Sequence, residues 1–262
     1  MSYWHALLLA IVEGLTEFLP VSSTGHMVIV ANLLGIGQLP FTETFITSIQ
    51  LGAILSVVVL YWRRFLQSFD FYLKLAVAFL PFGILGFLLK DVIADLLKSV
   101  TVVATSLVVG GLVLLFIDRI FKDPGKQITT PSYAKALKVG LFQCLALVPG
   151  VSRSAATIVG GLAQGFDRRS AADFSFLLAV PTMTVITAYE LYKTYKLNPL
   201  QAADIKVLLF GNAVAFVVAL LAVKSFVAFV SRYGFRAFGI YRIIVGGIIL
   251  TMIGLGINLQ LL

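Results

Sequence analysis

Two glutamates stand four residues apart near the start of the chain, inside an otherwise apolar stretch. Glu13 and Glu17 lie between the apolar run 7–12 and Phe18. Residues four apart share one face of a helix, so the two carboxylates would point the same way. A pair of close carboxylates can hold a divalent cation such as Mg²⁺ or Ca²⁺, or one of them can act as a general base.

A polar turn and a histidine follow the glutamates. Ser22, Ser23 and Thr24 form the turn, and His26 comes three residues after Ser23. Ser23 is a candidate nucleophile activated by Glu17 or His26, although a serine here could instead cap a helix. An imidazole beside a carboxylate could carry a proton at neutral pH, or it could pack against its own hairpin. The sequence leaves three nucleophiles open: Ser23, a water in its place, or His26.

A second polar turn surrounds Arg153. Ser152, Ser154 and Thr157 stand beside it, directly after the Pro-Gly pair at 149–150. A helix that begins here would direct its free backbone N–H groups and the positive end of its dipole into the turn. Guanidinium, hydroxyls and a helix N-terminus together form an anion site suited to phosphate. The alternative is an arginine that pairs with a carboxylate for packing alone. Since the first polar turn offers the same arrangement, two facing helix N-termini could hold two phosphoryl groups.

The composition places these turns in a membrane protein. Of the 262 residues, 60% are hydrophobic and only 12% are charged, and the mean hydropathy is +1.01. Soluble domains have about twice that charged fraction, so a soluble globule and a disordered chain are both excluded. The net charge of +8 is carried in short gaps between apolar runs, which indicates membrane topology and not a nucleic-acid-binding face. The single cysteine excludes an intramolecular disulfide framework.

Six apolar stretches are long enough to span a bilayer, which takes about 20 residues. Two further apolar regions, 3–35 and 136–164, are each interrupted by one of the polar turns, and each half is too short to cross. Two half-helices that meet at a polar turn indicate a re-entrant hairpin. At membrane depth, the backbone N–H and C=O groups of such a turn must be hydrogen-bonded by protein or water. The predicted spans are 41–62, 71–89, 100–118, 171–192, 207–230 and 239–260.

The order of elements is an internal repeat. A hairpin and three spans at about 1–120 are followed by a hairpin and three spans at about 133–262. Placing 13–26 over 143–156 gives three identities, one of which matches Ser22 with Ser152. We therefore expect an all-α polytopic protein that forms a single membrane domain over 1–262.

Lysines and arginines in the gaps give an orientation, because cytoplasmic loops carry an excess of them. The gaps 63–74, 119–138, 168–169 and 232–242 hold thirteen, with Arg242 the last of them, and the gaps on the opposite side hold five. The first set is assigned to the cytoplasm. Because three spans separate the hairpins, the first opens to the outside and the second to the cytoplasm, so the halves have inverted topology. The two polar turns are then expected to meet near the bilayer midplane.

The two turns carry a family resemblance. EGLTEFLPVSSTGH at 13–26 and PGVSRSAAT at 149–157 resemble the two signature motifs of the undecaprenyl-diphosphatase family, the bacterial bacitracin-resistance proteins. The resemblance extends over essentially the whole chain, including the WRR at 62–64 after the first full span. It implies a multi-pass enzyme of the bacterial cytoplasmic membrane that removes the terminal phosphate of undecaprenyl diphosphate. The product is the lipid carrier for peptidoglycan and other envelope polymers.

The resemblance also implies roles for individual residues. Glu13, Glu17, Ser23 and His26 would be catalytic, the activity would need a divalent cation near the two glutamates, and the site would open to the outer side of the membrane. The polyprenyl chain would lie in an apolar groove between spans. The resemblance assigns Arg153 to the diphosphate, and from the residues themselves we expect the neighbouring hydroxyls to bind it as well: Ser152, Ser154, Thr157, Ser22 and Thr24.

Two other functional classes remain at this stage. Broken helices in inverted repeats are also a transporter architecture, so the same site could carry a lipid phosphate across the membrane. A purely structural scaffold is disfavoured by the carboxylates and the arginine at membrane depth. The sequence leaves open whether the protein forms a homodimer.

Overall fold

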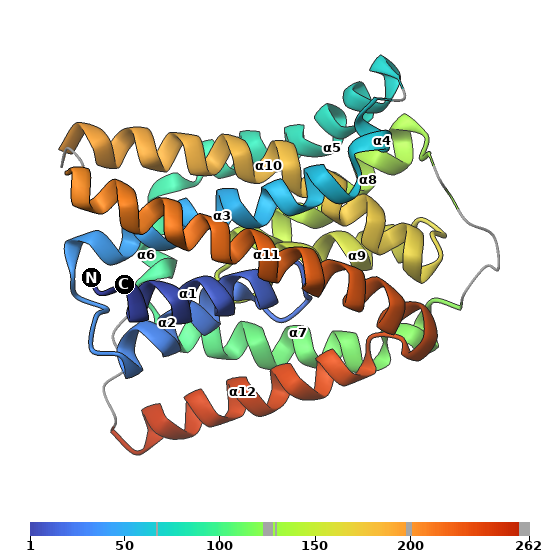
Figure 1. Ribbon diagram of the computed structural model, residues 1–262. Helices are drawn as coiled ribbons and strands as arrows, with labels where there is room; N and C mark the ends of the chain where they lie inside the picture. The colour runs from blue at the N-terminus through green and yellow to red at the C-terminus, as the bar shows by residue number, and fades with distance from the viewer. Residues whose placement is uncertain (67, 123–127, 129, 198–200, 257–262) are drawn as a thin grey trace.

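The described residues fold almost entirely into helices (Figure 1). The structure is a computed structural model, and it describes residues 1–66, 68–122, 128, 130–197 and 201–256. Within these residues there are twelve α-helices, one 3₁₀ helix and no β-strand. The helices are α1 (Tyr3–Thr16), α2 (Ser23–Leu33), α3 (Pro40–Leu60), α4 (Trp62–Phe65), α5 (Phe69–Leu88), α6 (Lys90–Leu97), α7 (Val100–Ile120), α8 (Tyr133–Gln143), η1 (Cys144–Leu147), α9 (Arg153–Ala163), α10 (Arg168–Leu197), α11 (Ala202–Tyr233) and α12 (Arg236–Gly254).

Six of these helices, α3, α5, α7, α10, α11 and α12, are long and apolar enough to cross a membrane. They coincide with the six predicted spans, whose existence is confirmed, and the chain is a multi-pass membrane protein. α10 and α11 extend three to five residues past the predicted bounds at both ends, whereas α3 ends two residues and α5 one residue before the predicted end. The last predicted residues of the sixth span, 257–260, and Lys126 lie outside the described residues.

Local signals explain where several helices begin and end. Ser68, Ser99 and Ser132 precede α5, α7 and α8, and each accepts a hydrogen bond from the backbone N–H three residues later. These are N-caps, which satisfy one of the free N–H groups of a helix start. α11 ends at Gly234, whose φ of 73° is readily adopted by glycine.

Both interrupted apolar regions are pairs of short helices. α1 and α2 have 14 and 11 residues, and α8 and α9 have 11 each. A helix of that length spans about 16–21 Å, less than the ~30 Å hydrocarbon core of a bilayer. The residues between the paired helices, 17–22 and 144–152, hold Glu17, Ser22 and Ser152, and the other motif residues lie in the adjoining turns of the helices. The predicted interruptions are confirmed.

The long helices pack side by side around the short ones (Figure 1). α12 packs on α7, α3 packs on both α10 and α11, α1 lies against α11, and α8 lies against α5. Glycines allow the closest approaches: a Cβ on Gly111 of α7 would lie 2.8 Å from the Gly239 carbonyl oxygen of α12, and a Cβ on Gly140 would lie 2.1 Å from the Ala78 carbonyl oxygen. Small residues at helix crossings are typical of membrane proteins, where close packing drives association.

One predicted placement is wrong. Arg242 was assigned to a cytoplasmic gap at 232–242, but it lies inside α12 and is fully buried. The connection between α11 and α12 is only Gly234 and Phe235. An arginine near the start of an apolar segment looks like a loop charge in a sequence, because the partners of Arg242 are supplied by distant parts of the chain. The excess of positive residues on that side is smaller by one but keeps its direction.

Candidate functional site

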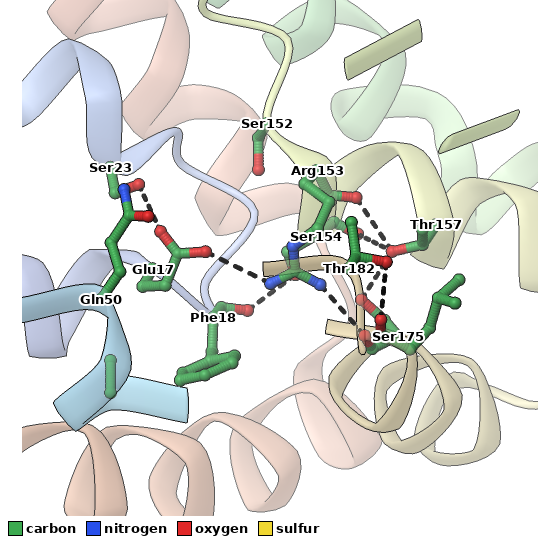
Figure 2. Close-up of polar contacts among 12 residues, drawn as sticks. Glu17, Phe18, Ser23, Gln50, Ser152, Arg153, Ser154, Thr157, Ser175 and Thr182 are labelled. Carbon is green, nitrogen blue, oxygen red and sulfur yellow. Dashed lines mark hydrogen bonds and ion pairs between the residues drawn. The ribbon is translucent and has the colours of Figure 1, made fainter. Parts of the chain in front are cut away.

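Glu17 links the two polar motifs. It follows the last residue of α1, and its carboxylate is buried. The Ser23 hydroxyl donates to its Oε2 at 2.6 Å, and the Arg153 guanidinium donates to its Oε1 at 3.4 Å. Figure 2 shows Glu17 between Ser23 on one side and Arg153 on the other. The prediction that the fold brings Glu17, Ser23 and Arg153 together is confirmed for these three residues.

Arg153 is the first residue of α9 and lies deep in the protein, with its side chain 11% exposed. Its Nη1 donates to the Ser175 carbonyl oxygen at 3.0 Å, and its guanidinium lies 5.9 Å from the centre of the Phe18 ring. Its Nε is buried and has no hydrogen-bond partner among the described residues. A buried donor without a partner is uncommon. The guanidinium therefore keeps capacity to bind an anion after it has paired with Glu17.

The hydroxyls beside Arg153 are engaged with the protein. Ser152 accepts from the backbone N–H of Ala155 at 3.2 Å, which caps α9. The Ser154 hydroxyl donates to the Phe18 carbonyl oxygen at 2.7 Å and so joins the two turns. The Thr157 hydroxyl donates to the Arg153 carbonyl oxygen at 2.9 Å and lies 2.6 Å from the Ser175 hydroxyl (Figure 2). In this arrangement Ser154 and Thr157 position the start of α9.

The first turn presents a different set of contacts. Ser22 is buried and precedes α2 without a side-chain capping bond, whereas Thr24 is exposed. His26 contacts the Ser22 carbonyl oxygen through Nδ1 at 2.8 Å and the Tyr241 hydroxyl through Nε2 at 2.6 Å. A carbonyl only accepts, so Nδ1 donates to Ser22, and when the ring is neutral Nε2 accepts from the Tyr241 hydroxyl. Both ring nitrogens of His26 are thus directed at groups other than Glu17 and Ser23.

The Glu13 carboxylate and its surroundings would suit a cation. It is fully buried, and neither carboxylate oxygen has a hydrogen-bond partner among the described residues. Buried carboxylate oxygens normally have partners, and hard oxygen ligands are those that Mg²⁺ and Ca²⁺ prefer. Within the described ranges no three His, Cys, Asp or Glu side chains cluster as a metal site. A cation at Glu13 and Glu17 would therefore need oxygens from water or substrate as well, and the residues present fit that description.

The family assignment rests on the whole chain. The family model described as "Bacitracin resistance protein BacA" matches residues 6–248. The chain belongs to the BacA family. Proteins named undecaprenyl-diphosphatase are similar to this BacA chain over nearly all of its length: 53% identity over 264 residues in Bdellovibrio bacteriovorus (100% of both chains), 53% over 255 residues in Flavobacterium johnsoniae (96% of both), and 48% over 280 residues in Porphyromonas gingivalis (99% of both).

The BacA chain also places uncharged polar residues at the site that the motifs did not indicate. Gln50 of α3 accepts from the Thr187 hydroxyl of α10 at 3.1 Å, and in Figure 2 its side chain points toward Ser23. Ser175 contacts both Arg153 and Thr157. Each lies inside a predicted span, Gln50 near the middle of 41–62 and Ser175 near the start of 171–192, where an amide or hydroxyl is less frequent than an aliphatic side chain. That was the signal available in the sequence, but it does not distinguish a site residue from one that bonds its own helix.

The arrangement in this BacA chain suits transfer of a phosphoryl group. Ser23 supplies a hydroxyl whose proton is already directed at a carboxylate, which is the geometry of a base-activated nucleophile. Arg153 supplies a cation for the phosphoryl oxygens, with an unused donor. The start of α2 adds backbone N–H groups with no side-chain cap. Nucleophile, base and anion-binding groups are thus brought together by Glu17.

Proposed function

We propose that this protein hydrolyses undecaprenyl diphosphate to undecaprenyl phosphate and inorganic phosphate. The name of the relatives gives the substrate and the reaction. The observation that carries the proposal is the position of Glu17, 2.6 Å from the Ser23 hydroxyl and 3.4 Å from the Arg153 guanidinium. The reaction returns the lipid carrier to cell-wall synthesis, and its loss would account for sensitivity to bacitracin.

The chemistry we propose uses Ser23 as nucleophile. Glu17 accepts the hydroxyl proton while the Ser23 oxygen forms a bond to the terminal phosphorus, and the bond from that phosphorus to the bridging oxygen breaks. Undecaprenyl phosphate leaves, and Arg153 offsets the charge on the phosphoryl oxygens. The leaving phosphate takes the proton from Glu17, and the regenerated carboxylate then accepts a proton from a water that hydrolyses the phosphoserine and releases phosphate. A direct attack by water is the second pathway, and His26, turned toward Tyr241, is the least favoured nucleophile.

Glu13 and Glu17 would hold a divalent cation, Mg²⁺ or Ca²⁺. The support is the pair of buried, unpartnered carboxylate oxygens on Glu13. When bound, such a cation lowers the cost of bringing the diphosphate charge to the two glutamates and stabilises charge on the phosphoryl oxygens. Ser22, Thr24 and the start of α2 would bind the phosphoryl group on the side opposite Arg153, with Ser152, Ser154 and Thr157 shaping the start of α9.

We further propose that residues 1–120 and 133–262 are inverted repeats within one membrane domain. The helix contacts support it: α3 pairs with its proposed counterpart α10, and α7 pairs with α12. α5 and α11 are proposed counterparts of each other. The first hairpin lies on α11, and the second hairpin lies on α5. The hairpins at 3–35 and 136–164 would both be re-entrant. With the orientation given by the positive residues, the site would open to the outer side of the bacterial cytoplasmic membrane.

The test is phosphate release from undecaprenyl diphosphate by purified protein in detergent. We expect release by the wild type, and a loss of at least ~100-fold in Glu17→Gln and Arg153→Ala, since positioned acid–base and charge-stabilising groups each contribute that much. Glu190→Gln is the control, because this carboxylate is partly exposed and is paired at 3.8 Å with Lys193. Phosphoserine trapped on wild type but not on Ser23→Ala would establish the covalent pathway. A folded wild type that binds the lipid but releases no phosphate would overturn the hydrolase and favour a transporter.

A further inference from the structure

Arg242 is a buried cation that has no carboxylate partner in the described part of the chain. It lies on α12 with no exposed surface. A guanidinium has five N–H groups, and all five are donated to backbone carbonyl oxygens. The acceptors are Leu107 at 3.3 Å, Pro20 at 3.1 Å, Val151 at 2.9 Å, Ser106 at 3.0 Å and Gly150 at 2.9 Å.

The five carbonyls belong to three separate parts of the chain. Two are in the middle of α7, one is in the turn that precedes Ser23, and two are in the turn that precedes Arg153. The same nitrogen, Nη1, bonds the Pro20 carbonyl of the first turn and the Val151 carbonyl of the second. Arg242 therefore fixes the distance between the two turns through their backbone carbonyls. Glu17 joins the same two turns through the side chains of Ser23 and Arg153.

The peptide groups that Arg242 holds lie directly before the site residues. The Val151 carbonyl belongs to the peptide that enters Ser152, a residue with φ of 75°, and Arg153 follows. The Pro20 carbonyl lies two residues before Ser22, which has φ of 68°. These are sparsely populated conformations for a serine, and they persist only when the surroundings enforce them. Arg242 supplies part of that enforcement in both turns.

α7 is shaped to admit the guanidinium. A Cβ on Gly110 would lie 2.3 Å from Nη2 of Arg242, and a Cβ on Gly111 would lie 3.1 Å from its Cβ. The two consecutive glycines leave the space in which the arginine reaches the α7 carbonyls. A charge in a membrane interior is costly and usually marks function, and a simple packing role would be filled at lower cost by an apolar side chain.

We propose that Arg242 is a positioning residue for phosphoryl transfer, whose guanidinium holds the two hairpin turns in the register that sets Ser23 and Glu17 against Arg153. The proposal rests on the proposed hydrolase function. It predicts an effect on the rate of the chemical step larger than the effect on substrate binding, because Arg242 does not face the substrate. A residue that served folding alone would change the amount of folded protein and leave kcat per folded molecule intact.

The experiment compares variants that disturb the five hydrogen bonds of Arg242, here called the clamp, in different ways. Arg242→Lys keeps the charge but cannot make five bonds, Arg242→Met removes both, and Gly110→Ala displaces the guanidinium without altering it. Gly247→Ala is the control, since a Cβ there meets nothing within 4 Å. Unfolding temperature, kcat and KM for phosphate release are measured in detergent, together with hydrogen exchange of the backbone at 17–24 and 148–154.

The expected result is a fall in kcat of at least tenfold in all three clamp variants, with KM changed less than threefold. Exchange should rise in both turns together in Gly110→Ala, and Gly247→Ala should behave as wild type. Full kcat in Arg242→Lys would overturn the proposal by assigning the effect to charge, and unchanged exchange and kcat in a folded Gly110→Ala would overturn it directly. Absence of phosphate release in wild type would instead contradict the hydrolase, and the exchange measurement would still decide whether Arg242 couples the turns.

Discussion

Ser22 and Ser152 adopt the same left-handed backbone conformation directly before the two helices that begin at the site. Their φ angles are 68° and 75°, and among the described residues no others except glycines have positive φ. Each stands one residue before a group that the chemistry needs, Ser23 in one turn and Arg153 in the other. A serine in such a conformation costs about 1–3 kcal/mol. The two turns thus use the same backbone geometry to present different chemistry.

A glycine at position 22 should separate the backbone from the hydroxyl. Ser22→Gly relieves the positive-φ strain and loses about 1 kcal/mol in chain entropy, so we expect an unchanged or higher unfolding temperature, worth about 0–2 kcal/mol. Ser22→Ala keeps the Cβ and the backbone strain, so its unfolding temperature should not rise. Both variants lack the hydroxyl, so phosphate release should fall by the same factor in each. A lower unfolding temperature in Ser22→Gly than in Ser22→Ala would contradict the strain at this turn.

Glu13 should control the response to divalent cations. Glu13→Gln removes a charged oxygen ligand and keeps the shape of the side chain, so the Mg²⁺ concentration for half-maximal phosphate release should rise roughly tenfold or more. The metal-free protein should be no less stable, because a buried amide costs less than a buried unpaired carboxylate. The measurement is phosphate release after EDTA treatment and titration with Mg²⁺ or Ca²⁺. An unchanged titration curve would remove Glu13 from the proposed ligands, with Glu190→Gln as the control.

The spans and the broken helices could be predicted because they depend on local composition. An apolar run of about 20 residues, or one broken by Pro-Gly and serines, is visible without knowledge of its neighbours. The approach of Glu17 to Arg153 was also within reach, since topology alone brings the two turns together. Their contact joins residues 136 apart in the sequence, and the charges in both motifs indicated it.

The contacts made by neutral groups could not be predicted in the same way. The partners of Arg242 are backbone carbonyls. Because every residue has one, no residue type in the sequence indicates which carbonyls Arg242 will bond. His26 meets Tyr241 across 215 residues, and either could have bonded elsewhere. Identical residue types at the same spacing are compatible with many partners. The tertiary packing that brings α12 to these groups selects among them.

The contact between Thr187 and Gln50 yields a prediction about a residue outside both motifs. The Thr187 hydroxyl donates to the Gln50 amide oxygen at 3.1 Å, which leaves the amide nitrogen to point toward the site (Figure 2). Thr187→Val removes the donor and keeps the shape, and a hydrogen bond of this kind is worth about 1 kcal/mol. We expect phosphate release to fall about fivefold, with Thr187→Ser close to wild type. Equal activity in Thr187→Val and wild type would show that the orientation of Gln50 has no effect on the reaction.

Asp118 at the end of α7 should contribute to stability and not to catalysis. One carboxylate oxygen accepts from the Arg168 side chain at 2.8 Å and the other from the Phe235 backbone N–H at 2.7 Å, so this residue joins α7 to α10 and to the turn before α12. Hydrogen bonds to a charged group contribute about 1.5–3 kcal/mol, and Asp118→Asn should lower the free energy of unfolding by roughly one such bond.

The matched control for Asp118 is the ion pair between Asp95 and Lys98 on α6 and just after it, whose side chains are 77% and 74% exposed. Exposed pairs contribute about 0–1 kcal/mol, so Asp95→Asn should barely change the unfolding temperature. Because the Asp118 contacts do not include a site residue, kcat per folded molecule should be preserved in both variants. Thermal unfolding in detergent beside phosphate release checks both statements. An Asp118→Asn protein no less stable than Asp95→Asn would show that the contacts of α7 with α10 and with the turn before α12 depend on apolar packing alone.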